Sequence, residues 1–353
     1  MPISLPSSTP DLSGRLPLLI TGLAGVAGYN AFHYFREKYP GQVFGIRRKD
    51  LWSMTGEGII AADVEDTDSL SRLFDEYQFK CILNTGGSCA LKHCELDFDM
   101  AYRVNVQGIK NLLNQIEGTD VRLIHLSIDL VFSGTRGGGH VETDPTDPVT
   151  VYGKTMVMGE RAVAQCRPDA PILRISLPMG ISYNGHAGAI DWIQNRYKFD
   201  RPATLYYDEV RTPTYTDCLN RLFEVVIGSE ISGLYHIGGK IRLSLYEIAQ
   251  IVNRVGGYDA KWLDGCYRLE AGPLPPRAGN VTMVSDKIME AVGYDPFTPW
   301  PYHTEFVPTH RDWHKERSGF KGSPELLAET LYQNPALLDA YSSSAYSSSA
   351  FSS

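Results

Sequence analysis

The sequence has no long apolar run, no cluster of basic residues and no paired cysteine motif. None of its apolar segments approaches the roughly 20 residues that a membrane-spanning helix needs. A formal net charge of −8, without any run of Lys and Arg, argues against nucleic acid as a partner. We therefore expect a soluble, cytoplasmic protein that binds neither membrane nor nucleic acid.

The cysteines and histidines offer no convincing metal site. Six cysteines are scattered along the chain without a Cys-x-x-Cys pair, so reduced thiols are expected. Cys89, His93 and Cys94 lie close together, but a structural zinc site needs about four ligands and the sequence has no second pair at suitable spacing. Near the end, His303, His310 and His314 are typical of surface or packing residues. We predict no metal.

What the sequence does have is a strand, a glycine-rich turn and a helix near its beginning. The apolar residues 16–20 lead into TGLAGVAG, and a helix is expected over residues 29–38. Glycines permit a tight turn and let the backbone approach a pyrophosphate, whose charge is met by the helix N-terminus. The residues predicted to bind a dinucleotide here are Thr21, Gly22, Gly25, Val26, Ala27 and Gly28.

Two arginines follow the next expected strand, residues 42–46. A site specific for NAD carries an acidic residue at this position for the ribose hydroxyls, whereas a guanidinium suits the 2′-phosphate of NADP. Arg47 and Arg48 therefore favour NADPH over NADH. The alternative is that two arginines at a strand end are only solvated charge.

Further strands and helices alternate at βαβ spacing. One strand ends at Asp63 and Val64 before a helix start at residues 66–68, and strand 81–84 leads into Thr85-Gly86-Gly87. Asp63 is placed to accept a hydrogen bond from an adenine amino group, or else it caps a turn. The cofactor-binding residues predicted from these segments are Asp63, Val64, Asn84, Thr85 and Gly86.

These patterns predict an α/β protein, a Rossmann-type doubly wound parallel sheet with a smaller C-terminal substrate-binding lobe. We expect a flexible leader at 1–14, a mainly NAD(P)-binding Rossmann domain at 15–175, and a substrate-binding lobe at 176–300 with segments returning to the Rossmann domain. A C-terminal extension at 301–338 and a low-complexity Ser/Tyr/Ala tail at 339–353 follow. Ser323 and Pro324 have the pattern of a helix start, and that helix is expected to pack on the main body or on a second subunit, which leaves a homodimer open.

The ordered motifs TGLAGVAG, RVNVQGIKNL, LSIDLVFSGT, ETDPTDPVTVYGKTMVMGE and DEVRTPTYTDCL resemble the extended short-chain dehydrogenase/reductase superfamily. Within it they are most similar to the dTDP-4-dehydrorhamnose reductase branch, which also includes the regulatory β subunit of methionine adenosyltransferase. The resemblance covers about residues 16–300.

In that family a tyrosine protonates the substrate carbonyl as hydride arrives from NADPH, and a lysine four residues later holds the nicotinamide ribose and lowers the tyrosine pKa. The resemblance places Tyr152 at the first position and Met156 at the second. The family hydroxyl that binds the carbonyl falls on Ile128, and the family asparagine falls on Asn105. The resemblance thus implies Tyr152 and Asn105 as catalytic residues, with Tyr152 also contacting the cofactor, and we predict Ser127, next to Ile128, as a third catalytic residue.

Loss of the lysine is serious because a free tyrosine has a pKa of about 10, and each pKa unit of lost shift is worth about 1.4 kcal/mol. Lys154 is no substitute, since residues two apart on a helix point about 200° apart. Ser127 and Ser133 are the candidates to replace the lost hydroxyl. Reduction tolerates the loss better than oxidation, because a neutral tyrosine can donate its proton.

Arg211 and Arg277, in the second half of the chain, are predicted to bind an anionic group of the substrate, although each alone is more often a structural ion-pair partner. Two functions remain. One is an NADPH-dependent reductase of a keto group on a nucleotide-activated sugar or related metabolite. The other is a catalytically impaired NAD(P)- or nucleotide-sugar-binding regulatory protein. The persistence of Tyr152, Asn105 and the glycine turn favours the reductase slightly.

Overall fold

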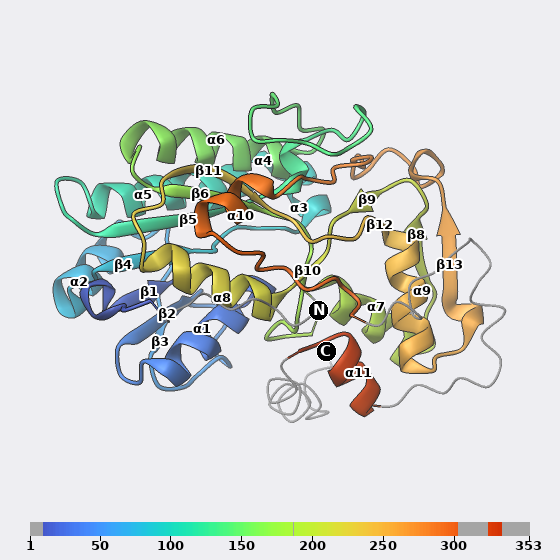
Figure 1. Ribbon diagram of the computed structural model, residues 1–353, viewed down its shortest axis with the longest axis horizontal. Helices are drawn as coiled ribbons and strands as arrows, with labels where there is room; N and C mark the ends of the chain where they lie inside the picture. The colour runs from blue at the N-terminus through green and yellow to red at the C-terminus, as the bar shows by residue number, and fades with distance from the viewer. Residues whose placement is uncertain (1–9, 186, 303–323, 334–353) are drawn as a thin grey trace.

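The computed structural model describes residues 10–185, 187–302 and 324–333. Figure 1 shows a central sheet with helices on both of its faces and a smaller part at one side. Within the described residues the sheet has seven strands, and each neighbouring pair runs parallel. In sheet order these strands are β11 (Gly233–Ile237), β6 (Pro171–Ile175), β5 (Arg122–Ile128), β4 (Cys81–Asn84), β1 (Leu18–Ile20), β2 (Val43–Arg47) and β3 (Ile59–Ala61). The predicted doubly wound α/β fold is confirmed.

Successive side chains of the central strands point to opposite faces of the sheet. Leu18 and Ile20 of β1 pack in the apolar core on one face, and Leu19 packs in the core on the other. The first core also receives α1 (Val26–Lys38) and α8 (Thr216–Ile227). Three helices pack in the second core: α2 (Thr67–Tyr77), α5 (Gly108–Gln115) and α6 (Val151–Cys166). Burial on both faces explains why these strands are continuously apolar rather than alternating.

The strand order reverses between β1 and β4, because the chain runs outward through β2 and β3 before it returns to the other side of β1. In open parallel sheets, ligands bind outside the carboxyl ends of the strands at such a reversal. The elements that follow β4 on this side are α3 (Leu91–Leu96), α4 (Phe98–Tyr102) and a π-helical turn (Arg103–Gln107) that leads into α5. The π-helical turn thus interrupts a helical stretch that runs from Phe98 to Gln115.

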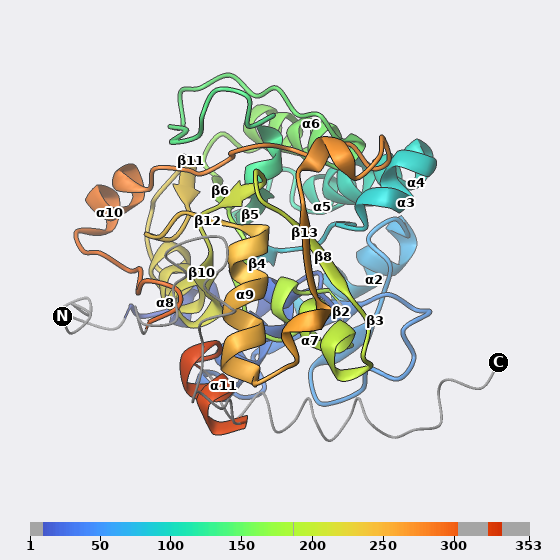
Figure 2. The ribbon, with the colours of Figure 1, turned by 90° about the vertical axis from the view of Figure 1, so that its right-hand side faces the viewer.

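The smaller part is built from segments that follow β6. Its elements are β7 (Pro178–Met179), α7 (Ala189–Lys198), β8 (Ala203–Tyr206), β9 (Val210–Arg211), β10 (Thr214–Tyr215), β12 (Leu243–Ser244), α9 (Leu245–Gly256) and β13 (Leu263–Cys266). Strands β8 and β13 pair in parallel, and α9 packs on both of them and on α7 (Figure 2). A capping box, in which Ser244 and Glu247 exchange hydrogen bonds with each other's backbone, begins α9.

The chain returns to the sheet from the smaller part through α8 and β11, and α10 (Asp286–Val292) packs beside β11. The last described segment contains α11 (Pro324–Thr330), while Ser323, His303, His310 and His314 lie outside the described residues. Among the residues that the structure covers, no helix is long and apolar enough to cross a membrane.

Candidate functional site

A cavity of about 320 Å³ lies at the carboxyl ends of the central strands, against the smaller part. On the sheet side it is lined by the glycine turn, the loop after β4, the end of β5 and α6. On the other side it is lined by α7, α9, β8 and β9. Of the predicted site residues, those that line the cavity are Gly25, Val26, Ala27, Gly28, Thr85, Gly86, Ser127, Ile128, Tyr152, Met156, Arg211 and Arg277.

The glycine turn packs so closely that a side chain would not fit. A methyl group on Gly28 would lie 2.4 Å from the carbonyl oxygen of Gly22 and 2.5 Å from Thr85 Oγ1. Gly22 itself has φ of +70°, and a methyl group there would lie 2.6 Å from the carbonyl oxygen of Thr85. The start of α1 therefore packs directly against the ends of β1 and β4, and this close packing is what the glycines of a dinucleotide-binding turn permit.

Thr21 and Asn84 do not line the cavity. They stabilise the glycine turn through hydrogen bonds. Thr21 Oγ1 donates to Asn84 Oδ1 at 2.6 Å and accepts from the Gly86 N–H at 3.0 Å. Thr85 Oγ1 donates to the Thr21 carbonyl at 2.6 Å. These bonds hold the ends of β1 and β4 together.

Tyr152 and Met156 project into the cavity from the first turns of α6. Thr150 caps the helix, with its hydroxyl accepting from the Gly153 N–H at 2.9 Å. Residues four apart lie on the same helix face, so both side chains are buried and line the cavity, whereas Lys154 is exposed. Met156 Sδ would lie 3.8 Å from a methyl group on Gly87. The side chain of Met156 thus occupies the space beside the loop after β4.

The environment of Tyr152 keeps its phenol neutral. Burial, reinforced by Cys89, Asp129 and Cys94, raises the pKa of Tyr152 well above its ordinary value. Among the described residues that line the cavity there is no lysine to act in the opposite direction. Tyr152 is therefore a proton donor and not a base at neutral pH.

Asn105 lies in the middle of the π-helical turn, and its buried side chain joins two walls of the cavity. Its Oδ1 accepts from the Ser88 N–H at 2.7 Å, and its Nδ2 donates to Thr155 Oγ1 at 2.9 Å. Its position beside α6 agrees with the resemblance, while its role in a reaction stays a prediction. π-Helical turns are rare and occur frequently at functional sites.

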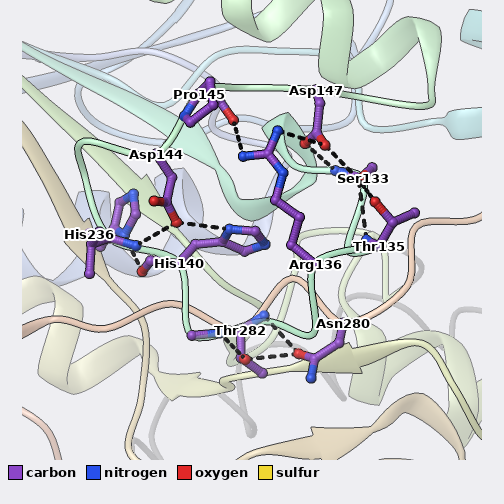
Figure 3. A network of polar contacts seen from close by, with 12 residues as sticks. Ser133, Thr135, Arg136, His140, Asp144, Pro145, Asp147, His236, Asn280 and Thr282 are labelled. Atoms are coloured by element: carbon purple, nitrogen blue, oxygen red, sulfur yellow. Dashed lines mark hydrogen bonds and ion pairs between the residues drawn. The ribbon is translucent and has the colours of Figure 1, made fainter.

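The two serines proposed to replace the lost hydroxyl differ in position. Ser127 is buried, lines the cavity beside Ile128, and its Oγ has no partner among the described residues. Ser133 lies outside the cavity lining, and its Oγ donates to Asp147 Oδ2 at 2.8 Å (Figure 3). The expectation for Ser133 is therefore wrong, because its hydroxyl serves the loop between β5 and α6.

Figure 3 shows how that loop is fixed. His140 stacks on Phe132 with ring centroids 4.0 Å apart, and its Nδ1 lies 3.2 Å from Asp144 Oδ2. Thr282 Oγ1 accepts from the Gly139 N–H at 2.9 Å. The loop is thus tied to the segment that follows Arg277, so one polar network holds both the approach to α6 and the segment next to this arginine.

A buried ion cluster at the cavity wall was not predicted. Arg211 Nη2 donates to Glu209 Oε1 at 2.6 Å, and Arg211 Nε lies 3.4 Å from Asp129 Oδ2. Ser176 Oγ also donates to Asp129 Oδ2, at 2.7 Å. Burial raises the pKa of both carboxyls, and Arg211 acts in the opposite direction. Because its charge is shared between two carboxyls, Arg211 fits the ion-pair alternative better than the anion-binding role.

Arg277 differs from Arg211 in its partners. Its guanidinium carbon lies 4.7 Å from the centre of the Tyr206 ring, and no described carboxylate forms a salt bridge with it. A guanidinium stacked on an aromatic ring keeps its edge donors for another acceptor. Of the two arginines, Arg277 is the one available to an anion in the cavity.

The residues expected around the adenosine lie outside the cavity lining. Arg47 Nε donates to the Met54 carbonyl at 2.6 Å, so Arg47 holds its own loop. Arg48 pairs with Asp50 at 2.8 Å, and both side chains are about two-thirds exposed, at 66% and 67%. Asp63 Oδ1 accepts from the Lys49 N–H at 3.1 Å. Exposed ion pairs contribute little to stability, so the Arg48 side chain can leave Asp50 and turn toward a phosphate.

The acidic cluster and the thiols do not form a metal centre. Among the described residues, no group of three or more His, Cys, Asp or Glu side chains could hold a metal ion. Cys89 lines the cavity and is exposed there, whereas Cys94 is buried, and burial raises the pKa of its thiol. Cys94 therefore behaves as a neutral thiol.

Comparison with known proteins places this site in a family. The dTDP-4-dehydrorhamnose reductase of Aggregatibacter actinomycetemcomitans is 27% identical over 291 residues, covering 79% of this chain and 94% of that protein. Methionine adenosyltransferase 2 subunit beta of Xenopus laevis is 28% identical over 246 residues, covering 65% and 69%. The crystal structure of dTDP-4-dehydrorhamnose reductase from Bacillus anthracis in complex with NADP is similar in fold, with a TM-score of 0.69 at 19% identity over 86% of this chain and 97% of that one. The family described as RmlD substrate binding domain matches residues 16–307. The chain therefore belongs to this family, within the extended short-chain dehydrogenase/reductases.

Proposed function

We propose that this protein is an NADPH-dependent reductase of a keto group on a nucleotide-activated sugar or a related metabolite. The observation that carries the proposal is that the glycine turn and Tyr152 line one cavity. A hydride donor held by the first and a proton donor supplied by the second are the two parts that carbonyl reduction needs. Similarity to reductases of dTDP-linked keto sugars supports the substrate class.

The residues fit a dinucleotide. The N–H groups of the first turn of α1, Val26–Gly28, and the positive end of this helix face a pyrophosphate, and Arg48 can turn toward a 2′-phosphate. Reduced nicotinamide would supply the hydride when bound. Met156 fills the place of the family lysine, so the ribose there would meet a thioether instead of an ammonium.

Tyr152 performs the proton step in this proposal. Its neutral phenol donates to the carbonyl oxygen as that oxygen gains charge, which the raised pKa permits in the direction of reduction. Ile128 gives no hydrogen bond to the carbonyl, so Ser127 is the nearest hydroxyl on β5 to assist. With fewer donors at the developing oxyanion, turnover should be slow.

The far wall of the cavity fits an amphiphilic substrate. Leu177, Leu205, Leu245 and Ile248 make it apolar, and Arg277 lies at the same wall. In this proposal Arg277 receives an anionic group such as a diphosphate, while the ring to be reduced lies between Tyr152 and the apolar wall.

The replacement of two polar catalytic positions by Met156 and Ile128 favours a second candidate function. In this alternative the protein binds NAD(P) or a nucleotide sugar and regulates a partner, without turnover. The sequence identity to the methionine adenosyltransferase β subunits is about as high as that to the reductases, and this similarity supports the regulatory class.

The deciding experiment is to incubate the protein with NADPH and dTDP-4-keto-6-deoxyglucose while following the absorbance of the reduced nicotinamide. Oxidation that is lost in Tyr152→Phe supports the reductase. Binding of NADPH by calorimetry with no oxidation supports the regulatory protein. Failure to bind any dinucleotide contradicts the reductase, and failure to bind either a dinucleotide or a nucleotide sugar contradicts both functions.

A further inference from the structure

The segment at 324–333 lies beyond residues 16–307, the part of the chain that the family matches, yet it is built into the body of the protein. α11 packs against α9, beside which it lies in Figures 1 and 2. Leu331 and Tyr332, which follow α11, are 0% and 3% exposed and belong to the main apolar core. This segment is therefore part of the folded domain and not an appendage.

Two backbone carbonyls anchor the segment. Tyr215 Oη donates to the Thr330 carbonyl at 2.7 Å, and Trp300 Nε1 donates to the Leu331 carbonyl at 3.4 Å. Both donors come from the part of the chain that the family shares. These anchors place the side chain of Tyr332 at the beginning of α7.

At that point Tyr332 Oη donates to Asp191 Oδ1 at 3.1 Å. The other oxygen of Asp191 accepts from Ser182, from its N–H at 2.6 Å and from its Oγ at 2.8 Å. Ser182 Oγ accepts in turn from the Ala187 N–H at 3.2 Å. Asp191 is only 3% exposed, and a buried carboxylate is tolerated when its oxygens are hydrogen-bonded. Tyr332 supplies a side-chain donor to Oδ1, the oxygen that Ser182 does not contact.

The carboxylate that Tyr332 holds sits within the wall of the cavity. The lining residues on this wall are Ala187, Gly188, Ala189, Trp192 and Ile193, which precede and follow Asp191 in the chain. A methyl group on Gly188 would lie 3.4 Å from Asp191 Oδ2, so this stretch rests directly on the carboxylate.

We propose that Tyr332 is a positioning residue, which acts through Asp191 to fix the wall of the cavity formed by residues 187–193. The C-terminal segment is thus a device of this chain for shaping the site that its relatives share. The proposal rests on the proposed function only in taking this wall as the side that faces the substrate.

The primary test measures local order and needs no substrate. In the full chain, Tyr332→Phe leaves Asp191 Oδ1 without its phenol, and amides in 187–193 should exchange hydrogen for deuterium about tenfold faster, the effect of losing one hydrogen bond to a charged group. Tyr39→Phe is the matched control, because Tyr39 Oη donates to the buried carboxylate of Glu224 at 2.9 Å, away from this wall. It should leave exchange in 187–193 unchanged.

Exchange in 187–193 that stays at the wild-type rate, or that rises equally across the whole chain, overturns the proposal. A double-mutant cycle checks the route. If Tyr332 acts through the carboxylate, Tyr332→Phe added to Asp191→Asn should change local exchange by less than Tyr332→Phe alone, whereas full additivity contradicts the route.

A kinetic measurement connects the wall to the substrate. If the wild type reduces the keto sugar, Tyr332→Phe should raise KM by about threefold or more, about half of the tenfold effect on a logarithmic scale, and leave kcat and NADPH affinity within about twofold. A fall in kcat of the same size, with KM unchanged, contradicts a positioning role for Tyr332. If the wild type shows no turnover, the proposed function fails, while the exchange result still decides this inference.

Discussion

The side-chain amide of Asn105 donates to the hydroxyl of Thr155, and that hydroxyl donates to the carbonyl oxygen of Tyr152, each at 2.9 Å. Because Asn105 also accepts from the Ser88 N–H, one buried amide joins the loop after β4 to the first turn of α6. The position of Tyr152 in the cavity therefore depends on a residue in a different helix.

Replacing Asn105 with alanine should destabilise the protein by about 1–3 kcal/mol, because the partly buried Ser88 N–H loses its acceptor and the buried Thr155 hydroxyl loses the donor to its oxygen. It should also weaken dinucleotide binding. Asn220→Ala is the control, since Asn220 is also buried, on α8, but donates to the Asn30 carbonyl, and neither residue lines the cavity. Denaturant unfolding and calorimetric titration of both variants check this, and identical binding losses would contradict it.

Met156→Lys should raise turnover at neutral pH by about tenfold or more, the scale of one recovered pKa unit for Tyr152. The side chains have similar length, and Met156 already points into the cavity. The control is Met158→Lys, because Met158 is exposed on the same helix. Steady-state rates of both variants are compared with that of the wild type. Met158→Lys should have no effect.

The double change Met156→Lys with Ile128→Thr should restore both polar positions. We expect activity above that of either single variant, since the threonine hydroxyl adds a donor to the developing oxyanion. A folded double variant that binds NADPH and reduces no keto-sugar nucleotide would refute the reductase and leave the regulatory function.

Arg48→Ala should weaken NADPH binding by about tenfold and leave NADH binding unchanged, because the lost contact is to the 2′-phosphate. Arg167→Ala serves as the control. Arg167 pairs with Asp169 in the same i, i+2 geometry, but at the amino end of β6. Equal loss for both dinucleotides would mean that Arg48 contributes only general charge.

Stability should fall as pH decreases from about 6.5 toward 4. Burial, assisted by Arg174, lowers the pKa of His236 to about 4, and burial lowers that of His125 to about 4 as well. The unfolded chain, with histidine pKa near 6.5, binds more protons in this interval, so acid favours unfolding. Each histidine should cost about 1–2 kcal/mol between pH 6.5 and 5. Unfolding of His236→Gln should show a smaller loss over the same interval.

Local pattern was sufficient to predict the fold and the sheet side of the cavity. The glycine turn, strand 81–84 and the helix start at Asp66 depend on neighbours in sequence, and each is found where expected. The opposite directions of Met156 and Lys154 followed from helix periodicity alone.

The far side of the cavity depends on contacts that no local pattern contains. Asp129 reaches Arg211 from a distant segment of the chain, at the end of β5, and Tyr332 meets Asp191 from 141 residues away. Ser133 was misplaced because a short 3₁₀ turn at Asp129–Val131 redirects the chain after β5. Sequence spacing does not reveal such a change of direction.

The close packing of Gly22, Gly28 and Thr85 divides the site into two kinds of position for protein engineering. At the turn, backbone atoms touch, so any added carbon must move a strand or a helix. Positions 128 and 156 also line the cavity, but they lie on a regular strand and a regular helix. New chemistry can therefore be introduced by exchanging side chains on α6 and β5 without changing the glycine turn that is proposed to bind the dinucleotide.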